Sequence, residues 1–138
     1  PKVAELGVEM VEQPLPPGQD HLLEQVDPIL PIAADESCID RSSLPNLQGR
    51  YQVVNIKLDK TGGMTEALEL AREAREQGFE IMVGCMIGTS LAMAPALLLA
   101  QQARWVDLDG PLLLAEDRTE GLRYEDSQVY PATAALWG

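Results

Sequence analysis

Five short apolar runs recur along this 138-residue chain at a spacing that suits one repeated structural unit. Each run begins 22 to 28 residues after the one before it, a length that accommodates a strand, a loop, a helix and a return loop. The runs cover residues 7–12, 30–35, 52–57, 80–85 and 104–109. Alternating strand and helix signals are typical of βα units, which build a parallel sheet covered by helices. The sequence therefore predicts an α/β fold with about five parallel strands.

The segments between the runs carry helix signals. The clearest covers residues 65–77, where Thr65 is expected to cap the helix and Gly78 to end it in the left-handed conformation. Its apolar stripe is expected to consist of Ala67, Leu68, Ala71 and Ala74. A second helix is expected over residues 90–102. Both helices are expected to cover a face of the sheet.

One uncharged segment, residues 81–103, is long enough to cross a bilayer. It contains two glycines, two glutamines and Pro95, which suit a membrane span poorly. A buried strand followed by an Ala/Leu-rich helix explains the segment better, and no membrane association is expected.

The acidic net charge of the chain argues against two classes of binding partner, nucleic acids and membrane surfaces. The chain has 22 acidic and 10 basic residues and a net charge of −12, so it lacks the basic face that a nucleic-acid binder needs. The same balance disfavours an electrostatic membrane anchor. Two cysteines, Cys38 and Cys85, are too few for a disulfide framework, which favours reduced thiols and a cytoplasmic location.

Charged residues stand where the apolar runs end. They are Glu12, Asp35, Lys57 and the pair Asp107 and Asp109. Sites in parallel α/β folds form at the carboxyl ends of the strands, so these side chains are expected to line one edge of the sheet. A single charge at a strand end can equally serve only to solvate a loop, but four strands with the same feature favour a site.

The residue types suggest a chemistry. Carboxylates of Glu12 and Asp35 on adjacent strands could bind a hard divalent cation through oxygen. A cation there would lower the pKa of Lys57 on the next strand and make a neutral amine available as a base. That combination suits proton abstraction next to a carboxylate, while Asp107 and Asp109 could hold an ammonium group. The alternative is a non-catalytic acidic α/β module that binds a cation or a partner protein.

Five segments together resemble the enolase superfamily, in its muconate-lactonizing-enzyme-like group. They are 11–14 (Val-Glu-Gln-Pro), 34–37 (Ala-Asp-Glu-Ser), 55–57 (Asn-Ile-Lys) with Gly62-Gly63 following, 84–86 (Gly-Cys-Met) and 107–110 (Asp-Leu-Asp-Gly). The last segment is similar to the Asp-x-Asp motif of dipeptide epimerases, especially L-Ala-D/L-Glu epimerases. The five segments occur in the order that this superfamily has.

The resemblance implies a fold. Members have an N-terminal capping domain and a modified TIM barrel, (β/α)7β, and residues 1–138 correspond to the C-terminal portion of the barrel, about five strands. The capping domain, the first barrel strands, the partner lysine and the first metal-ligand aspartate would lie outside this chain. A hairpin near residues 124–130 resembles the tail that packs on the cap. The chain alone is expected to fold poorly and to show no racemisation.

The resemblance also implies a reaction. Glu12 and Asp35 correspond to the second and third ligands of Mg²⁺, which stabilises an enediolate. Lys57 corresponds to one of two lysines that flank the substrate α-carbon, one removing the proton and the other returning it on the opposite face. The implied enzyme is an isomerase that inverts the α-carbon of the C-terminal residue of a dipeptide.

The resemblance leaves the substrate partly open. Asp107 and Asp109 correspond to the pair that holds the α-ammonium of the dipeptide, and Cys85 to a position that lines the substrate. The substrate most like the family is L-Ala-D-Glu from murein peptide turnover. Alternatives within the superfamily are an N-acylamino acid racemase, o-succinylbenzoate synthase or a cycloisomerase, whose substrates have no free ammonium. Assembly into a homo-oligomer is a further possibility.

Overall fold

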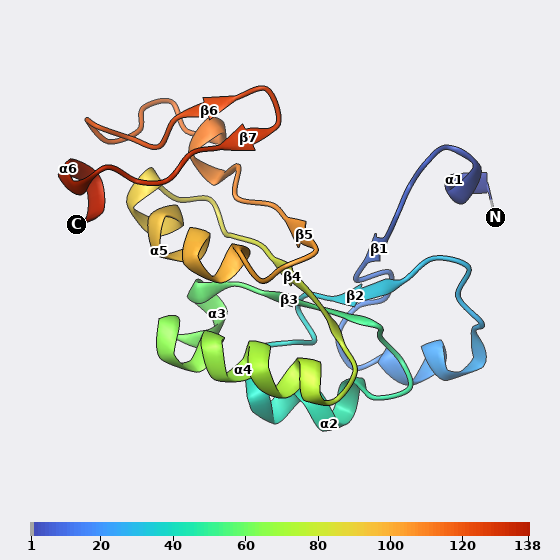
Figure 1. Cartoon of the computed structure of the whole chain (residues 1–138). Coiled ribbons are helices and arrows are strands. Elements are labelled where there is room, and N and C mark those ends of the chain that lie inside the picture. Colours follow the sequence, from blue (N-terminus) through green and yellow to red (C-terminus); the bar gives the residue numbers. More distant parts are fainter. Residues whose placement is uncertain (1) are drawn as a thin grey trace.

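A parallel sheet of five consecutive strands forms the centre of the molecule. The computed structural model describes residues 2–138, and its strands lie side by side in chain order (Figure 1). They are β1 (Val11–Glu12), β2 (Ile32–Ala34), β3 (Val53–Ile56), β4 (Glu80–Val83) and β5 (Trp105–Val106). Each strand lies within a predicted apolar run, and every neighbouring pair is parallel. The predicted α/β fold with successive βα units is confirmed.

Three helices pack beside the sheet. They are α2 (Leu44–Leu47), α4 (Met64–Glu76) and α5 (Ser90–Ala100), and in Figure 1 α2 and α4 lie together below the strands. Shorter elements fill the remaining connections: α1 (Lys2–Glu5), η1 (Asp20–Gln25), η2 (Arg41–Ser43), α3 (Leu58–Thr61), η3 (Gly110–Leu113) and α6 (Ala134–Trp137). No helix within residues 2–138 has the length and apolar character needed to span a membrane.

The alternation of side chains along β3 separates the two faces of the sheet. Val54 and Ile56 lie in the main core with α4 and α5, whereas Val53 packs in a small second cluster with Ala33 and Met82. Successive strand residues point to opposite faces, so Asn55 and Lys57 share the second face. This alternation points the polar residues away from the helices.

Helix α4 differs from its prediction in two details. It begins at Met64 and its N-cap is Gly63, at φ +136°, so the prediction that Thr65 caps it is wrong. Its buried residues are Ala67, Leu70, Ala71 and Ala74, while Leu68 is 41% exposed. Leu70 takes the place expected for Leu68 because positions i, i+3, i+4 and i+7 share a helix face, whereas i+1 turns away from it.

The C-terminal part forms the expected hairpin. Strands β6 (Tyr124–Glu125) and β7 (Gln128–Val129) pair antiparallel, and Asp126 in the turn has φ +53°. In Figure 1 the hairpin lies on the side of α5, at the end of the molecule away from β1 and α1. It therefore stands next to the β5 edge of the sheet.

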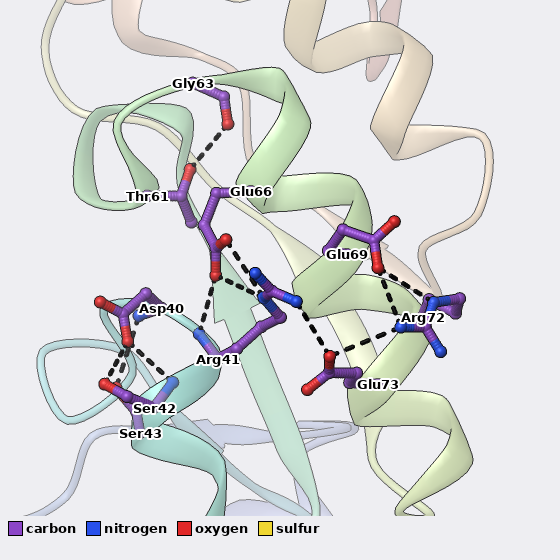
Figure 2. Close-up of polar contacts among 10 residues, drawn as sticks. All are labelled: Asp40, Arg41, Ser42, Ser43, Thr61, Gly63, Glu66, Glu69, Arg72 and Glu73. Atoms are coloured by element: carbon purple, nitrogen blue, oxygen red, sulfur yellow. Dashed lines mark hydrogen bonds and ion pairs between the residues drawn. The ribbon is translucent and has the colours of Figure 1, made fainter.

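An ion-pair network on the outer surface joins η2 to α4 (Figure 2). Arg41 of η2 pairs with Glu66 at 2.9 Å and with Glu73 at 3.1 Å, and Arg72 pairs with Glu69 at 2.9 Å and with Glu73 at 3.4 Å. We call these five residues the outer network. It links the β2–β3 connection to the long helix that follows β3.

Candidate active site

All six residues expected to form the site lie at the carboxyl edge of the sheet. Glu12 ends β1, Asp35 and Lys57 directly follow β2 and β3, Cys85 follows β4, and Asp107 and Asp109 follow β5. Adjacent parallel strands bring their carboxyl ends to one edge, so a contribution from each strand produces a continuous row. A separate apolar cavity of about 500 Å³ lies beside β1, and none of the six residues lines it.

Two lysines converge on one buried carboxylate. Lys57 Nζ lies 2.7 Å from Asp35 Oδ2 and Lys60 Nζ lies 2.6 Å from Asp35 Oδ1. The three side chains are only 12–16% exposed. We call Asp35, Lys57 and Lys60 the site cluster.

The cluster shifts the titration of its members. Burial alone would raise the pKa of Asp35, but the hydrogen bonds and charges of the two lysines hold that pKa below its usual value. Burial alone would lower the pKa of Lys57, yet the hydrogen bond and charge of Asp35 raise it. Both shifts favour the ion pair of a Lys57 ammonium with an Asp35 carboxylate, whereas the neutral amine is expected only when a cation is bound beside it.

Sequence reasoning missed Lys60. It lies in the single turn of α3, whose N-cap residue is Lys57, and a spacing of three residues in a helical turn places both side chains on one side. The left-handed Gly62, at φ +77°, then ends the turn. A second lysine three positions after the first, just before two glycines, is the signal that could have identified it.

Gln13 fixes the backbone that carries Asp35, and it was also missed. Its side-chain oxygen accepts hydrogen bonds from the N–H groups of Asp35 at 2.9 Å and Ser37 at 3.3 Å. Its amide nitrogen donates to Tyr51 at 3.0 Å, and Tyr51 in turn donates to Asp20. Gln13 has φ +37°, an uncommon conformation for a residue with a side chain. The segment after Glu12 is thereby tied to the loop that follows β2.

Asn55 connects Glu12 to the interior of the sheet edge. Its amide nitrogen donates to the carboxylate of Glu12, and its buried Oδ1 has no hydrogen-bond partner among the described residues. A Cβ at Gly84, which directly follows the neighbouring strand β4, would lie 2.7 Å from that oxygen. Gly84 therefore provides the space in which the Asn55 side chain lies.

The acidic pair and Cys85 follow β5 and β4, close enough to Lys57 for its charge to affect the pKa of Asp107 and of Cys85. Burial and the negative charge of Asp109 raise the pKa of Asp107, and the positive charge of Lys57 opposes that shift. Burial likewise raises the pKa of Cys85, and the two aspartates add to the effect. The hairpin contributes a contact, because the Tyr124 hydroxyl donates to the carbonyl of Leu108 at 2.7 Å, between the two aspartates.

The residues present can hold part of a magnesium site. Among residues 2–138 no group of three or more His, Cys, Asp or Glu side chains is placed to bind a metal ion. Glu12 and Asp35 nevertheless supply two hard oxygen donors at the ends of adjacent strands, and Asn55, whose amide nitrogen donates to Glu12, has an Oδ1 without a partner among the described residues. Mg²⁺ prefers oxygen ligands and retains several waters. The donor set fits that ion if its other ligands are water or groups outside residues 2–138.

This arrangement suits proton transfer beside an anion. A lysine can exchange a proton only where its nitrogen has room for a substrate atom, and Lys57 uses one of its three donors among the described residues. Carboxylates on one side of it could hold a cation, and the Asp107–Asp109 pair on the other could hold a positively charged group. An amino-acid derivative with a carboxylate and an amine matches both ends.

Comparison with known proteins gives consistent matches. The family described as enolase C-terminal domain-like matches residues 1–135. An N-acetyl-D-glutamate racemase from a Pseudoalteromonas species is 59% identical over 133 residues, which are 96% of this chain and 42% of the relative. The L-Ala-D/L-Glu epimerase of Escherichia coli (strain K12) is 55% identical over 128 residues, 93% of this chain and 40% of the relative.

Comparison with solved structures gives matches to the same kind of protein. An enolase family member from Agrobacterium tumefaciens with homology to dipeptide epimerases, holding sodium and L-Ala-L-Glu, has a TM-score of 0.95 and 57% identity, covering 99% of this chain and 42% of its own. A dipeptide epimerase from Methylococcus capsulatus, complexed with Mg and L-Arg-D-Lys, has a TM-score of 0.85 and 34% identity, covering 95% and 40%. The chain thus spans about 40% of the length of these proteins.

Proposed function

This chain belongs to the enolase C-terminal domain-like family, and from that membership and the geometry of the sheet edge we propose that it is part of a Mg²⁺-dependent dipeptide epimerase. Residues 1–138 would form the C-terminal portion of the catalytic barrel, with the capping domain and the first strands contributed from outside this chain. The substrate would be a dipeptide such as L-Ala-L-Glu or L-Ala-D-Glu.

One observation carries the proposal. Lys57, directly after β3, pairs with the Asp35 carboxylate at 2.7 Å, and its charge also acts on Asp107, which follows β5, so a substrate with a carboxylate and an ammonium group would have a partner on each side of this lysine. Lys57 would exchange the α-proton, Asp107 and Asp109 would hold the α-ammonium, and Cys85 would line the side of the substrate. Two of the structural relatives hold dipeptides, which supports this class of ligand.

The proton transfer follows from these positions. Lys57 in its neutral form would take the proton from the α-carbon of the C-terminal residue, and the electron pair of the broken C–H bond would move into the adjacent carboxylate. A proton returned to the opposite face, by a group outside this chain, would complete the inversion. Lys57 then holds the proton it removed and can return it in the reverse direction.

The metal-binding residues would also control the charge around Lys57. Mg²⁺ bound by Glu12 and Asp35 would supply positive charge beside the substrate carboxylate and offset the negative charge that now raises the pKa of Lys57. Gln13 would keep Asp35 in place through its backbone N–H.

A second function has specific support. The relative at 59% identity is an N-acetyl-D-glutamate racemase, so racemisation of an N-acetyl amino acid is the competing proposal. An N-acetyl group has no positive charge, so the Asp107–Asp109 pair would have no ammonium to bind. The same lysine chemistry would serve either substrate.

The test is α-proton exchange in D₂O with Mg²⁺, followed by NMR, in the whole protein that carries this chain. L-Ala-L-Glu and N-acetyl-L-glutamate are compared side by side. Deuterium at the glutamate α-carbon together with the inverted epimer supports the reaction, and the faster substrate identifies the class. Replacing both aspartates by Asn is expected to abolish turnover of the dipeptide and to spare the N-acetyl substrate. Absence of exchange with both substrates would contradict both proposals.

A further inference from the structure

We propose that Lys60 is a positioning residue that holds the carboxylate of Asp35 in one orientation and so leaves Lys57 as the lysine that exchanges protons. This inference rests on the proposed function and assigns different roles to two lysines that contact the same carboxylate. It depends on how many donors of each ammonium group are already used.

The ammonium of Lys60 is saturated. Its nitrogen donates to Asp35 Oδ1 at 2.6 Å, to the main-chain carbonyl of Asp35 at 2.6 Å and to that of Asn55 at 3.0 Å. A lysine ammonium has three donors and no acceptor, so these contacts occupy all of them. Lys60 has no donor left for a substrate and is poorly placed to carry a proton.

The ammonium of Lys57 is not saturated. Within residues 2–138 it has one hydrogen-bond partner, Asp35 Oδ2 at 2.7 Å, so two of its three donors are unused, and its charge acts on Asp107 and Cys85. The two lysines are equally sheltered, at 14% and 16% side-chain exposure, so burial does not distinguish them. The number of unused hydrogen-bond donors distinguishes Lys57 from Lys60.

The contacts of Lys60 fix both the backbone and the side chain of Asp35. The two carbonyls it binds belong to Asp35, directly after β2, and to Asn55 of β3, so one ammonium joins the carboxyl ends of neighbouring strands. Because Lys60 also binds Oδ1, rotation of the carboxylate is restricted and Oδ2 is directed toward Lys57. An oriented Asp35 can bind a cation through Oδ2 with less loss of side-chain freedom.

The experiment separates positioning from charge. Lys60→Met, Lys60→Arg and Lys57→Met are made in the whole protein, and Mg²⁺ binding is measured by calorimetric titration without substrate. If Lys60 acted only through its charge, Lys60→Met would bind Mg²⁺ more tightly and Lys60→Arg as wild type does. Positioning predicts that both weaken binding about 10- to 100-fold. Lys57→Met removes a competing ammonium and is expected to bind Mg²⁺ at least as tightly as wild type.

Kinetics at saturating Mg²⁺ complete the test. Lys60→Met is expected to keep kcat within about tenfold of wild type once metal is saturating, whereas Lys57→Met loses about 1,000-fold. Unweakened Mg²⁺ binding in both Lys60 variants would overturn the inference, as would loss of exchange in Lys60→Met equal to that of Lys57→Met.

Each failure has its own signature. If Lys60→Met does not fold, Lys60→Arg decides the question, because it retains the charge without the three-point contact. A wild-type protein that binds Mg²⁺ but epimerises neither substrate contradicts the proposed function, while the titrations still decide the role of Lys60. A wild-type protein that binds no Mg²⁺ contradicts both.

Discussion

The site cluster and the outer network are built from the same kinds of charge in opposite surroundings. In the outer network the paired side chains are 28–52% exposed, whereas in the site cluster they are 12–16% exposed. The outer network joins η2, in the connection between β2 and β3, to α4, the helix that follows β3 (Figure 2). The site cluster joins the carboxyl ends of two strands.

The difference in exposure separates stability from function. An exposed ion pair contributes little, because water solvates either partner when the pair is broken. A buried pair is costly to assemble and more costly to break, since the remaining charge stays partly desolvated. Charges that serve only stability are expected on the surface, so the buried Asp35 with its two lysines points to a chemical role.

The largest expected difference between the two regions is in catalysis. Lys57→Met removes the proposed proton carrier and is expected to slow α-proton exchange about 1,000-fold, the scale of a lost general base. Arg41→Met, at the centre of the outer network, is expected to leave the exchange rate within about twofold of wild type. Deuterium incorporation by NMR on the two variants measures both rates. Comparable losses in the two would show that the regions are not functionally distinct.

Stability gives the next comparison. Asp35→Asn leaves two partly buried ammonium groups facing a neutral amide, and we expect a loss of about 3 kcal/mol in the free energy of unfolding. Glu66→Gln removes one carboxylate from the outer network, where water replaces it, so its unfolding midpoint should stay close to that of wild type. Urea unfolding of both variants of the whole protein checks this. A larger loss for Glu66→Gln would reverse the ranking.

Much of this organisation is visible in the sequence. The spacing of the apolar runs located all five strands, and the charged residues that end four of these runs located Glu12, Asp35 and Lys57 at one sheet edge. These features depend on local pattern and on the rule that parallel strands align their carboxyl ends. The roles assigned to these residues stay predictions.

The residues that contact and position the site residues could not be predicted from local sequence patterns. Gln13 accepts a hydrogen bond from the N–H of Asp35 and has an uncommon backbone conformation, φ +37°, which no local sequence pattern indicates. Asn55 was recognised only as part of a sequence segment, and its contact with Glu12 depends on the space that Gly84 leaves directly after the next strand. Lys60 follows from the single turn of α3, too short an element to give a periodic signal. Tertiary contacts decide all three.

A smaller loss of stability is expected at Gly84, which packs against Asn55 beside the site cluster. Gly84→Ala would place a Cβ 2.7 Å from Oδ1 and 2.8 Å from Nδ2 of Asn55, so the amide must move and its contact with Glu12 must weaken. We expect a destabilisation of about 2 kcal/mol, typical of overpacking at a buried position. Gly88→Ala is the matched control, because its Cβ would meet neighbours at 3.4 Å or more. Urea unfolding and Mg²⁺ titration of both variants test this, and equal behaviour would contradict it.

The pH dependence of stability, measured with and without salt, is expected to show the smallest difference between the site cluster and the outer network. Pairing lowers the pKa of Asp35 and of Glu66 in the folded protein, so each contributes stability above its ordinary value and loses it as the pH falls through the lowered one. In about 0.5 M NaCl the Debye length falls to about 4 Å, which screens the exposed pairs but not the buried ones. Salt is therefore expected to remove the contribution of Glu66 to acid-dependent stability, which Glu66→Gln removes as well. The contribution of Asp35, which Asp35→Asn removes, is expected to persist in salt. Unfolding midpoints between about pH 2 and 6, with and without salt, measure the two parts. If salt removed the Asp35 contribution as well, the site cluster would be as open to solvent as the outer network, and its burial would no longer argue for a chemical role.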